Sequence, residues 1–179
     1  MMRDRIVGIL DYQAGNIHSI ESAFGHLGAR VVRGRSDKDL ADITHVLLPG
    51  VGAFGHCAEQ LRATGLIPSL KKAVLEGGKP MLGICVGMQL LSDHSEELGG
   101  HDGLGWIGGS VRQIQPQRPG ERVPHVGWND VRFEEDFGAF AAGQSADFYF
   151  DHSFAYRDPR TGRAIGICEH GGEFAAVVR

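Results

Sequence analysis

Hydrophobic residues at the start of the chain form one short unbroken run and then a helical stripe. The run Ile6–Leu10 contains no polar side chain, which is expected of a strand buried on both faces. A polar turn over residues 11–16 follows, and apolar residues then recur at helical spacing from Ile17 to Leu27. Asn16 is suited to cap the start of this helix, and Gly28 to end it. The pattern predicts a strand followed by a helix.

The same alternation of strand and helix continues to about residue 93. Two helices are predicted, one opened by Pro68 and closed by Gly77 and Gly78, the other running from Val86 to about Asp93. Strands are predicted at Val31–Val32, His45–Leu48 and Met81–Ile84. This order predicts a parallel sheet with helices on both faces, in which ligands bind at the carboxyl ends of the strands.

The second half of the chain changes character after a stretch with six glycines between Gly99 and Gly109. Short strand-like runs separated by turns then follow, at Ser110–Ile114, Val131–Phe133, Phe148–Phe150 and Ile165–Ile167. The predicted fold class is therefore α/β: a doubly wound, mostly parallel sheet with an added antiparallel strand region, all within one domain over residues 1–179.

Composition narrows the function classes. A length of 179 residues suits one domain, and the net charge of −4 without any basic block gives no footprint for nucleic acid. No apolar run approaches 18 residues, so neither a membrane span nor a membrane partner is predicted. The three cysteines give no disulfide framework, which favours a reducing, cytoplasmic setting.

The clearest chemical motif is Gly-Ile-Cys-Val-Gly at residues 83–87, at a predicted strand-to-helix junction. It is the thiol analogue of the Gly-x-Ser-x-Gly elbow, in which a sharp turn exposes a nucleophile at the end of a sheet. The start of a helix favours the thiolate form of Cys85, and the Val86 N–H points to where an acyl oxyanion would form. A second donor could come from the loop over residues 49–52. The alternative is that Cys85 is a small buried hydrophobic residue; its position after a buried strand favours the nucleophile.

Other candidate residues are weaker. The nine histidines lack metal-ligand spacing and the glycines form no phosphate-binding fingerprint, so no metal and no cofactor are predicted. Gln89 lies one turn after Cys85 and either faces the same pocket or the helix surface. His125 either shapes a loop or has a functional role. Trp128, expected in a loop, is more typical of an interface than of a core.

Four segments give these residues a family context. Residues 83–91 resemble the nucleophile segment of class I (triad) glutamine amidotransferases, which hydrolyse glutamine and pass ammonia to a synthase. Residues 49–55, 124–129 and 149–154 resemble segments of the amidotransferase subunit of imidazole glycerol phosphate synthase in histidine biosynthesis. Asp151 and Phe154 depart from the Tyr-Phe-Val-His-Ser-Tyr pattern of that subunit, whereas residues 11–16 also fit it.

The resemblance implies a flavodoxin-like amidotransferase fold and a role for each matching residue. Cys85 would attack the side-chain amide of glutamine, with Gly52 and Val86 at or beside the oxyanion site. The partner would be a cyclase subunit with a (βα)₈ barrel, which receives the ammonia within a heterodimer and whose own substrate activates the glutaminase. The residues that would hold glutamine are Gln89, Glu97, His152 and Ser153. Those that would face the cyclase are Asn16, Trp128 and Asn129.

One expected motif is missing. The family carries a catalytic His-Pro-Glu near its carboxyl terminus, and this sequence contains none, which implies a domain lacking its C-terminal segment. His94-Ser95-Glu96 has the same spacing, but it is predicted at or just after the helix that follows Cys85, as a solvated surface segment. We therefore assign no catalytic base and expect this chain alone to be close to inactive as a glutaminase.

Three functions remain open at this point. The chain is a shortened glutaminase subunit, a non-catalytic docking subunit that stabilises a barrel partner, or another hydrolase with a cysteine elbow and a similar sheet. The third predicts neither the segment over residues 124–129 nor glutamine binding.

Overall fold

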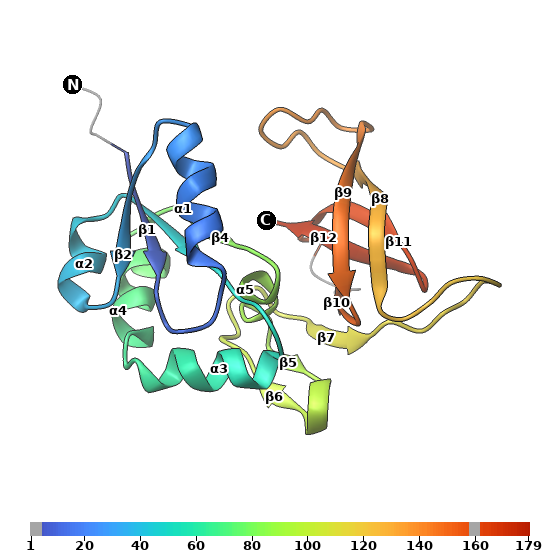
Figure 1. Cartoon of the computed structure of the whole chain (residues 1–179), viewed down its shortest axis with the longest axis horizontal. Helices are drawn as coiled ribbons and strands as arrows, with labels where there is room; N and C mark the ends of the chain where they lie inside the picture. The colour runs from blue at the N-terminus through green and yellow to red at the C-terminus, as the bar shows by residue number, and fades with distance from the viewer. Residues whose placement is uncertain (1–4, 158–161) are drawn as a thin grey trace. The chain divides into compact units, whose positions relative to one another are not determined.

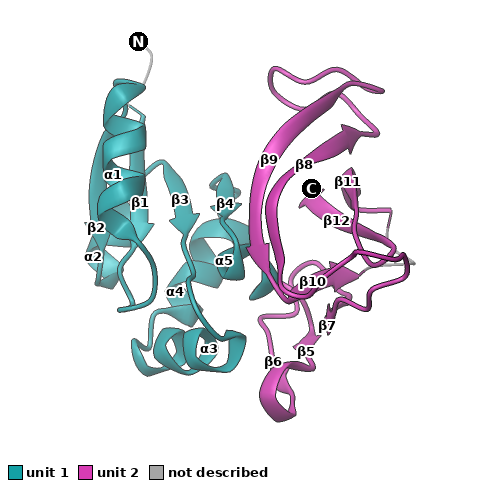
Figure 2. Ribbon diagram, turned by 45° about the vertical axis from the view of Figure 1, so that its right-hand side comes forward, with its two compact units in different colours: residues 1–90 teal, residues 91–179 magenta. Residues whose placement is uncertain are grey.

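The computed structural model describes residues 5–157 and 162–179, and the chain divides into two compact units, residues 1–90 and 91–179. Figure 2 colours the first unit teal and the second magenta. The boundary follows α5, close to where the sequence pattern changes from alternating strands and helices to glycine-rich turns and short strands. Among the described residues, no helix is both long and apolar enough to cross a membrane.

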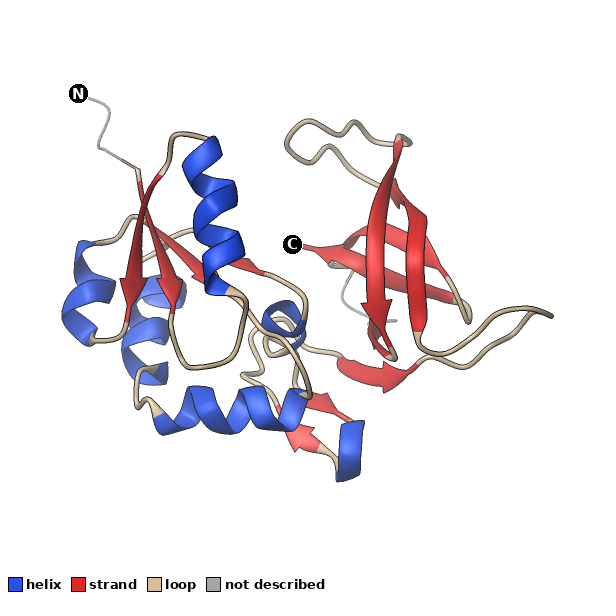
Figure 3. Ribbon diagram, viewed as in Figure 1, coloured by secondary structure: helices blue, strands red, loops and turns tan. Residues whose placement is uncertain are grey.

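The first unit is built on a four-stranded parallel sheet (Figures 1 and 3). Its strand order is β2-β1-β3-β4, formed by β1 (Ile6–Leu10), β2 (Arg30–Gly34), β3 (His45–Leu48) and β4 (Met81–Gly83). The helices of this unit are α1 (Ile17–His26), α2 (Asp37–Asp42), α3 (Phe54–Ala63), α4 (Ile67–Lys71) and α5 (Val86–Gln89), with a π-helical segment η1 (Lys72–Glu76). The predicted parallel sheet is confirmed.

Helices lie against both faces of this sheet, as the sequence pattern predicts. On one face, Val7 and Ile9 of β1 pack with Leu47 of β3 in a cluster that α1 covers through Ile17, Ile20 and Phe24. On the other face, a Cβ added to Gly8 would lie 2.4 Å from the side chain of Ile43, which follows α2. The two faces of β1 are thus both buried, which explains the unbroken apolar run in its sequence.

Two helices of the first unit were not predicted from the sequence. Helix α2 begins with a capping box, in which the Ser36 side chain accepts from the Asp39 N–H and the Asp39 carboxylate accepts from the Ser36 N–H. Helix α3 begins at Phe54 and buries a stripe of four side chains at helical spacing: Phe54, Cys57, Ala58 and Leu61. The loop after β3 therefore ends at Ala53, the residue before this helix.

The helix after Cys85 is also shorter than predicted. Helix α5 ends at Gln89 instead of near Asp93. The carbonyls of Leu91, Ser92 and Asp93 accept hydrogen bonds from the N–H groups of Trp106, Gly105 and Gly103, at 2.8, 2.9 and 2.9 Å. The Asp93 N–H donates to the Gly109 carbonyl at 3.1 Å instead of to the carbonyl of Gln89, so the helical ladder does not extend to Asp93.

The second unit contains two four-stranded sheets, whereas the sequence pattern predicts antiparallel strands without their division into two sheets. One sheet has the order β10-β7-β5-β6, formed by β10 (Phe154–Arg157), β7 (Ser110–Gln113), β5 (His94–Ser95) and β6 (His101–Asp102). The other has the order β12-β11-β8-β9, formed by β12 (Glu173–Val178), β11 (Ala164–Glu169), β8 (His125–Phe133) and β9 (Ser145–His152). All pairs are antiparallel except β5 with β7, and a short 3₁₀ turn, η2 (Glu97–Gly99), lies between β5 and β6.

Two local predictions in this unit are wrong. The segment His94-Ser95-Glu96 is not wholly a solvated surface segment, because His94 and Ser95 form β5 and Ser95 is buried. Trp128 does not lie in a loop: it is in the middle of β8, paired with Tyr149 of β9. Both differences arise because strand pairing with distant residues decides the local conformation.

Candidate active site

Cys85 occupies the junction between β4 and α5 in a conformation that few non-glycine residues adopt. Its backbone has φ 55° and ψ −122°, and the residue is exposed. A positive φ at a residue with a side chain costs of order 1–3 kcal/mol and persists only where the surrounding structure enforces it. This is the sharp strand-to-helix turn that the sequence motif predicts, with the thiol accessible at the carboxyl end of the sheet.

The glycines around Cys85 enforce the turn, because each lies where backbone approaches backbone. A Cβ on Gly83 would lie 2.7 Å from the Met88 Cα, and one on Gly87 would lie 2.0 Å from the Leu48 carbonyl oxygen. Gly50, in the loop after β3, would place a Cβ 2.5 Å from the Gly87 nitrogen. The elbow and the 49–52 loop are therefore packed directly against each other, with no room for a side chain.

This packing brings the two predicted oxyanion donors to the same edge of the sheet. Val86 is the first residue of α5, so its N–H has no acceptor within the helix. Gly52 follows β3 with φ 94°, a conformation that favours glycine. Because α5 has only four residues, its dipole contributes little, and the individual N–H groups are the relevant electrostatic feature.

The predicted glutamine-holding residues fall in both units. Gln89 is buried on α5, four residues after Cys85. In the second unit, Glu97 begins η2, His152 ends β9, and Ser153 follows at the turn into β10. The carbonyl of Ser153 accepts from the Ile114 N–H at 2.9 Å, which fixes the backbone at this turn. Their roles toward glutamine remain predictions.

Strand pairing joins His152 to His125 in a hydrogen-bonded chain. His125 Nδ1 lies 2.9 Å from His152 Nε2, and His152 Nδ1 lies 3.0 Å from the Phe154 carbonyl oxygen. Asn129 Nδ2 lies 3.2 Å from His125 Nε2. A carbonyl can only accept, so His152 donates from Nδ1, and its Nε2 then accepts from His125 Nδ1–H. His125 Nε2 in turn accepts from the Asn129 amide.

This chain of donors requires both imidazoles to be neutral. Burial, together with the nearby His170 and His152, lowers the pKa of His125 to about 4. Burial also lowers the pKa of His152, partly opposed by its hydrogen bond to Phe154. Both ring nitrogens of His152 are hydrogen-bonded to other residues of the second unit. A ligand could therefore contact this residue only through its backbone or its ring carbons.

The third histidine of this cluster was not predicted. His170 follows β11, and its ring stacks on His125 with centroids 3.9 Å apart. Its Nε2 lies 2.8 Å from the Arg122 carbonyl. No local sequence signal reveals the contact, because the strand register sets it over 45 residues of sequence. Among the described residues, no group of three or more His, Cys, Asp or Glu is arranged to hold a metal ion.

The predicted partner-facing residues have three different environments. The side chain of Asn16 accepts from the Ser19 N–H at 3.2 Å and caps α1, as predicted. Trp128 is 72% exposed and stands edge-on to Tyr149, which is 59% exposed. Asn129 lies on the opposite face of β8, where it donates to His125. Two exposed aromatic side chains at adjacent positions form a surface typical of a protein interface.

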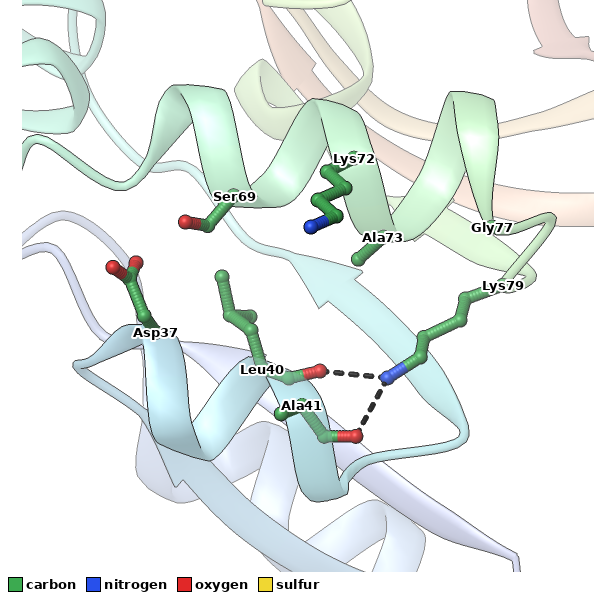
Figure 4. A pocket seen from close by; sticks show the side chains of 8 residues that line it. All are labelled: Asp37, Leu40, Ala41, Ser69, Lys72, Ala73, Gly77 and Lys79. Atoms are coloured by element: carbon green, nitrogen blue, oxygen red, sulfur yellow. Dashed lines mark hydrogen bonds between the residues drawn. The ribbon is translucent and has the colours of Figure 1, made fainter.

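A hollow of about 370 Å³ lies elsewhere on the first unit, lined by residues of α2, α4 and η1 (Figure 4). Across it, Lys79 Nζ donates to the carbonyl oxygens of Leu40 and Ala41 at 2.7 and 3.0 Å. Lys79 precedes β4 and Cys85 follows it, so this hollow lies toward the other end of the sheet from the thiol. Its lysine stabilises the end of α2.

Comparison with known proteins points to the same kind of site as the geometry around Cys85. The sequence matches the family described as glutamine amidotransferase class-I over residues 8–179. It is 41% identical over 176 residues to a Zymomonas mobilis protein named imidazole glycerol phosphate synthase subunit HisH, covering 96% of this chain and 82% of that protein. A Rhodospirillum rubrum protein of the same name is 38% identical over 181 residues, covering 96% and 85%.

Solved structures resemble the chain in fold. One described as a glutamine amidotransferase gives a TM-score of 0.70 at 19% identity, covering 92% of this chain and 84% of that one. The structure of PurLQS from Thermotoga maritima gives 0.70 at 19% identity, covering 94% and 78%. These likenesses confirm the predicted fold class.

Proposed function

The chain belongs to the class I glutamine amidotransferase family, and we propose that it is the glutaminase subunit of an imidazole glycerol phosphate synthase. In this role it hydrolyses glutamine to glutamate and supplies ammonia to a cyclase subunit in histidine biosynthesis. The observation that carries the proposal is the exposed Cys85 elbow at φ 55°, packed through Gly87 and Gly50 against the 49–52 loop. Relatives named as this subunit align over nearly the whole chain.

The proposed reaction begins with attack of the Cys85 thiolate on the side-chain carbonyl carbon of glutamine. The carbonyl electron pair moves to oxygen, where the N–H groups of Val86 and Gly52 stabilise the negative charge. Collapse of this oxyanion forms a thioester and breaks the bond to the amide nitrogen, which takes a proton from an acid and leaves as ammonia. Water then hydrolyses the thioester, giving glutamate and the free thiol.

The proton transfers are the incomplete part of this reaction. The sequence contains no His-Pro-Glu motif, and we assign no general acid or base within it. The chain alone is therefore expected to release ammonia only very slowly, since general acid–base catalysis contributes about 10²–10⁴-fold.

The proposed partner is a cyclase with a (βα)₈ barrel, bound through the surface that carries Trp128, with Asn16 and Asn129 as further interface residues. The residues proposed to hold glutamine are Gln89, Glu97, His152 and Ser153. At His152, the backbone would make the contact with glutamine. A cytoplasmic location fits the proposal because a reducing compartment keeps all three cysteines reduced and out of disulfides.

The test is to mix the purified chain with a cyclase subunit and to measure complex formation and glutamate release, beside Cys85→Ala. We expect a stable complex and negligible release by the chain alone. Steady release abolished by Cys85→Ala would contradict the missing acid and base. A cyclase complex in which glutamine does not protect Cys85 from alkylation would favour the docking subunit, and loss of both properties would reject the proposed function.

A further inference from the structure

Two buried side chains hold the 49–52 loop from the core of the first unit. The Tyr12 hydroxyl donates to the Pro49 carbonyl oxygen, and the Cys57 thiol donates to the Val51 carbonyl oxygen at 3.4 Å. Tyr12 is 2% exposed and Cys57 is fully buried. Cys57 lies close enough to Tyr12 to contribute to the raised pKa of its hydroxyl. Residues from two separate segments, the turn after β1 and helix α3, thus meet beneath one loop.

These contacts fix the direction of the N–H groups in the loop. In a trans peptide the C=O and N–H bonds point in opposite directions. Because the Val51 carbonyl points toward Cys57, the N–H of Gly52 in the same peptide points away from the core. The Pro49 carbonyl points toward Tyr12, and the Gly50 N–H of that peptide is likewise directed away from it.

The loop needs these hydrogen bonds because its own sequence does little to restrict its backbone conformation. Two of its four residues are glycines, which have the widest conformational freedom of any residue. Backbone contact of Gly50 with Val86 and Gly87 limits the loop on the side of the elbow. Contact of Gly15 with Pro49, where an added Cβ would lie 2.9 Å from the ring, limits it at its start. Neither contact orients a particular peptide plane, whereas a hydrogen bond to a carbonyl does.

We propose that Tyr12 and Cys57 are positioning residues that aim the N–H groups of the 49–52 loop at the oxyanion formed on Cys85. This inference rests on the proposed function. A carbonyl oxygen only accepts, so each side chain must donate its proton. Burial strongly raises the pKa of Tyr12, so its hydroxyl stays protonated at every pH at which the protein is handled. Neither side chain touches the substrate; both act through the backbone of the loop.

The test compares two alkylations of the Cys85 thiol in the full chain. In both, sulfur forms a bond to carbon while a halide leaves with the bonding electrons, so no general acid is needed. The first reagent, the glutamine-like chloroketone 2-amino-4-oxo-5-chloropentanoic acid, places a ketone oxygen at the oxyanion site. The second, iodoacetamide, reports on the thiolate alone. The ratio of the two rate constants measures the oxyanion site separately from the thiol.

Tyr12→Phe and Cys57→Ala should each lower this ratio by about tenfold or more, because an N–H group that no longer points at the oxyanion stabilises it much less. Cys57→Ser, which keeps a donor, should restore most of it. Matched controls are Tyr156→Phe and Cys168→Ala, which remove a hydroxyl and a thiol buried in the second unit, and these should leave the ratio unchanged.

Equal ratios in wild type, Tyr12→Phe and Cys57→Ala would overturn the inference. Equal losses in the Tyr156→Phe and Cys168→Ala controls would also overturn it, since the effect would then follow from destabilisation. The amide ¹H and ¹⁵N shifts of Gly52 provide a second readout: they should move in Tyr12→Phe and remain in place in Tyr156→Phe. If instead wild type shows no glutamine-protected reaction with the chloroketone, the proposed function itself fails.

Discussion

Gly50 and Gly87 touch through their backbones, since a Cβ added to Gly50 would lie 2.5 Å from the Gly87 nitrogen. These residues lie 37 positions apart, in the loop after β3 and at the start of α5. The contact joins the predicted oxyanion loop to the elbow that carries Cys85. Catalytic geometry of this kind depends on small displacements, so the two glycines are as important to the site as the residues with functional groups.

Gly50→Ala should therefore disturb both stability and reactivity. The new methyl would meet backbone atoms of Val86 and Gly87, and we expect a loss of about 1–3 kcal/mol in the free energy of unfolding. The matched control is Gly25→Ala on α1, where an added Cβ meets nothing within 4 Å. That variant should be neutral or more stable by up to about 1 kcal/mol. Urea unfolding of both variants checks this, and equal stability of the two would contradict the packing argument.

Asn16→Ala should lower the free energy of unfolding by about 1 kcal/mol, because it removes the side-chain oxygen that caps α1. Asn16→Asp keeps an acceptor at the same position and should retain the stability. Thermal unfolding of the two variants separates capping from any role in partner binding. A stable Asn16→Ala would show that the cap contributes nothing. An Asn16→Asp variant that is stable but binds the cyclase weakly would support the proposed interface role.

Much of the first unit could be predicted from its sequence because its signals are local. The apolar runs of β1 and β3, the cap at Asn16 and the stop at Gly28 all appear where the pattern predicts them. The elbow at Cys85 could also be predicted, because two glycines flanking a cysteine at a strand end determine a sharp turn.

Other features could not be predicted, because they depend on residues far apart in the chain. Helix α5 does not extend to Asp93 because the Asp93 N–H donates to the carbonyl of Gly109, 16 residues further along the chain. Trp128 belongs to a strand only because β9 pairs with it. The register of β8 with β9 also brings His125 opposite His152, although each had been identified separately. Helix α2 is a different case, because its capping residues Ser36 and Asp39 are a local signal in the sequence.

Stability should fall as the pH is lowered through the range in which His125 titrates. The pKa of this buried histidine is lowered to about 4, with His152 and His170 opposing its charge and Glu121 favouring it. Between about pH 6.5 and 4 the unfolded chain binds a proton that the folded chain excludes, so the free energy of unfolding decreases in this window and His125 has no effect above it.

His125→Gln should flatten this pH dependence because glutamine does not titrate. Val126→Ala, an exposed neighbour without a titratable group, is the matched control and should keep the wild-type slope. Urea unfolding between pH 7.5 and 4 measures the slopes. Indistinguishable slopes for His125→Gln and wild type would contradict the assignment of a neutral, buried His125.

Trp128→Ala should weaken binding to the cyclase by at least about tenfold, because exposed tryptophans at interfaces often dominate the binding energy. The free energy of unfolding should change by less than about 0.5 kcal/mol, as is usual for an exposed side chain. The matched control is Leu27→Ala, which removes an exposed apolar side chain of the first unit. Calorimetric titration with a cyclase subunit checks both variants, and equal affinities would contradict the proposed interface.

The most direct measurement of the whole account is the site of modification by the glutamine-like chloroketone, mapped by mass spectrometry of the intact chain and its peptides. The account predicts one adduct per chain, on Cys85, slowed by added glutamine and absent in Cys85→Ala. Cys57 and Cys168, which are buried, should remain unmodified. Modification that ignores glutamine, or that persists in Cys85→Ala, would contradict the claim that this thiol is the glutamine-directed nucleophile.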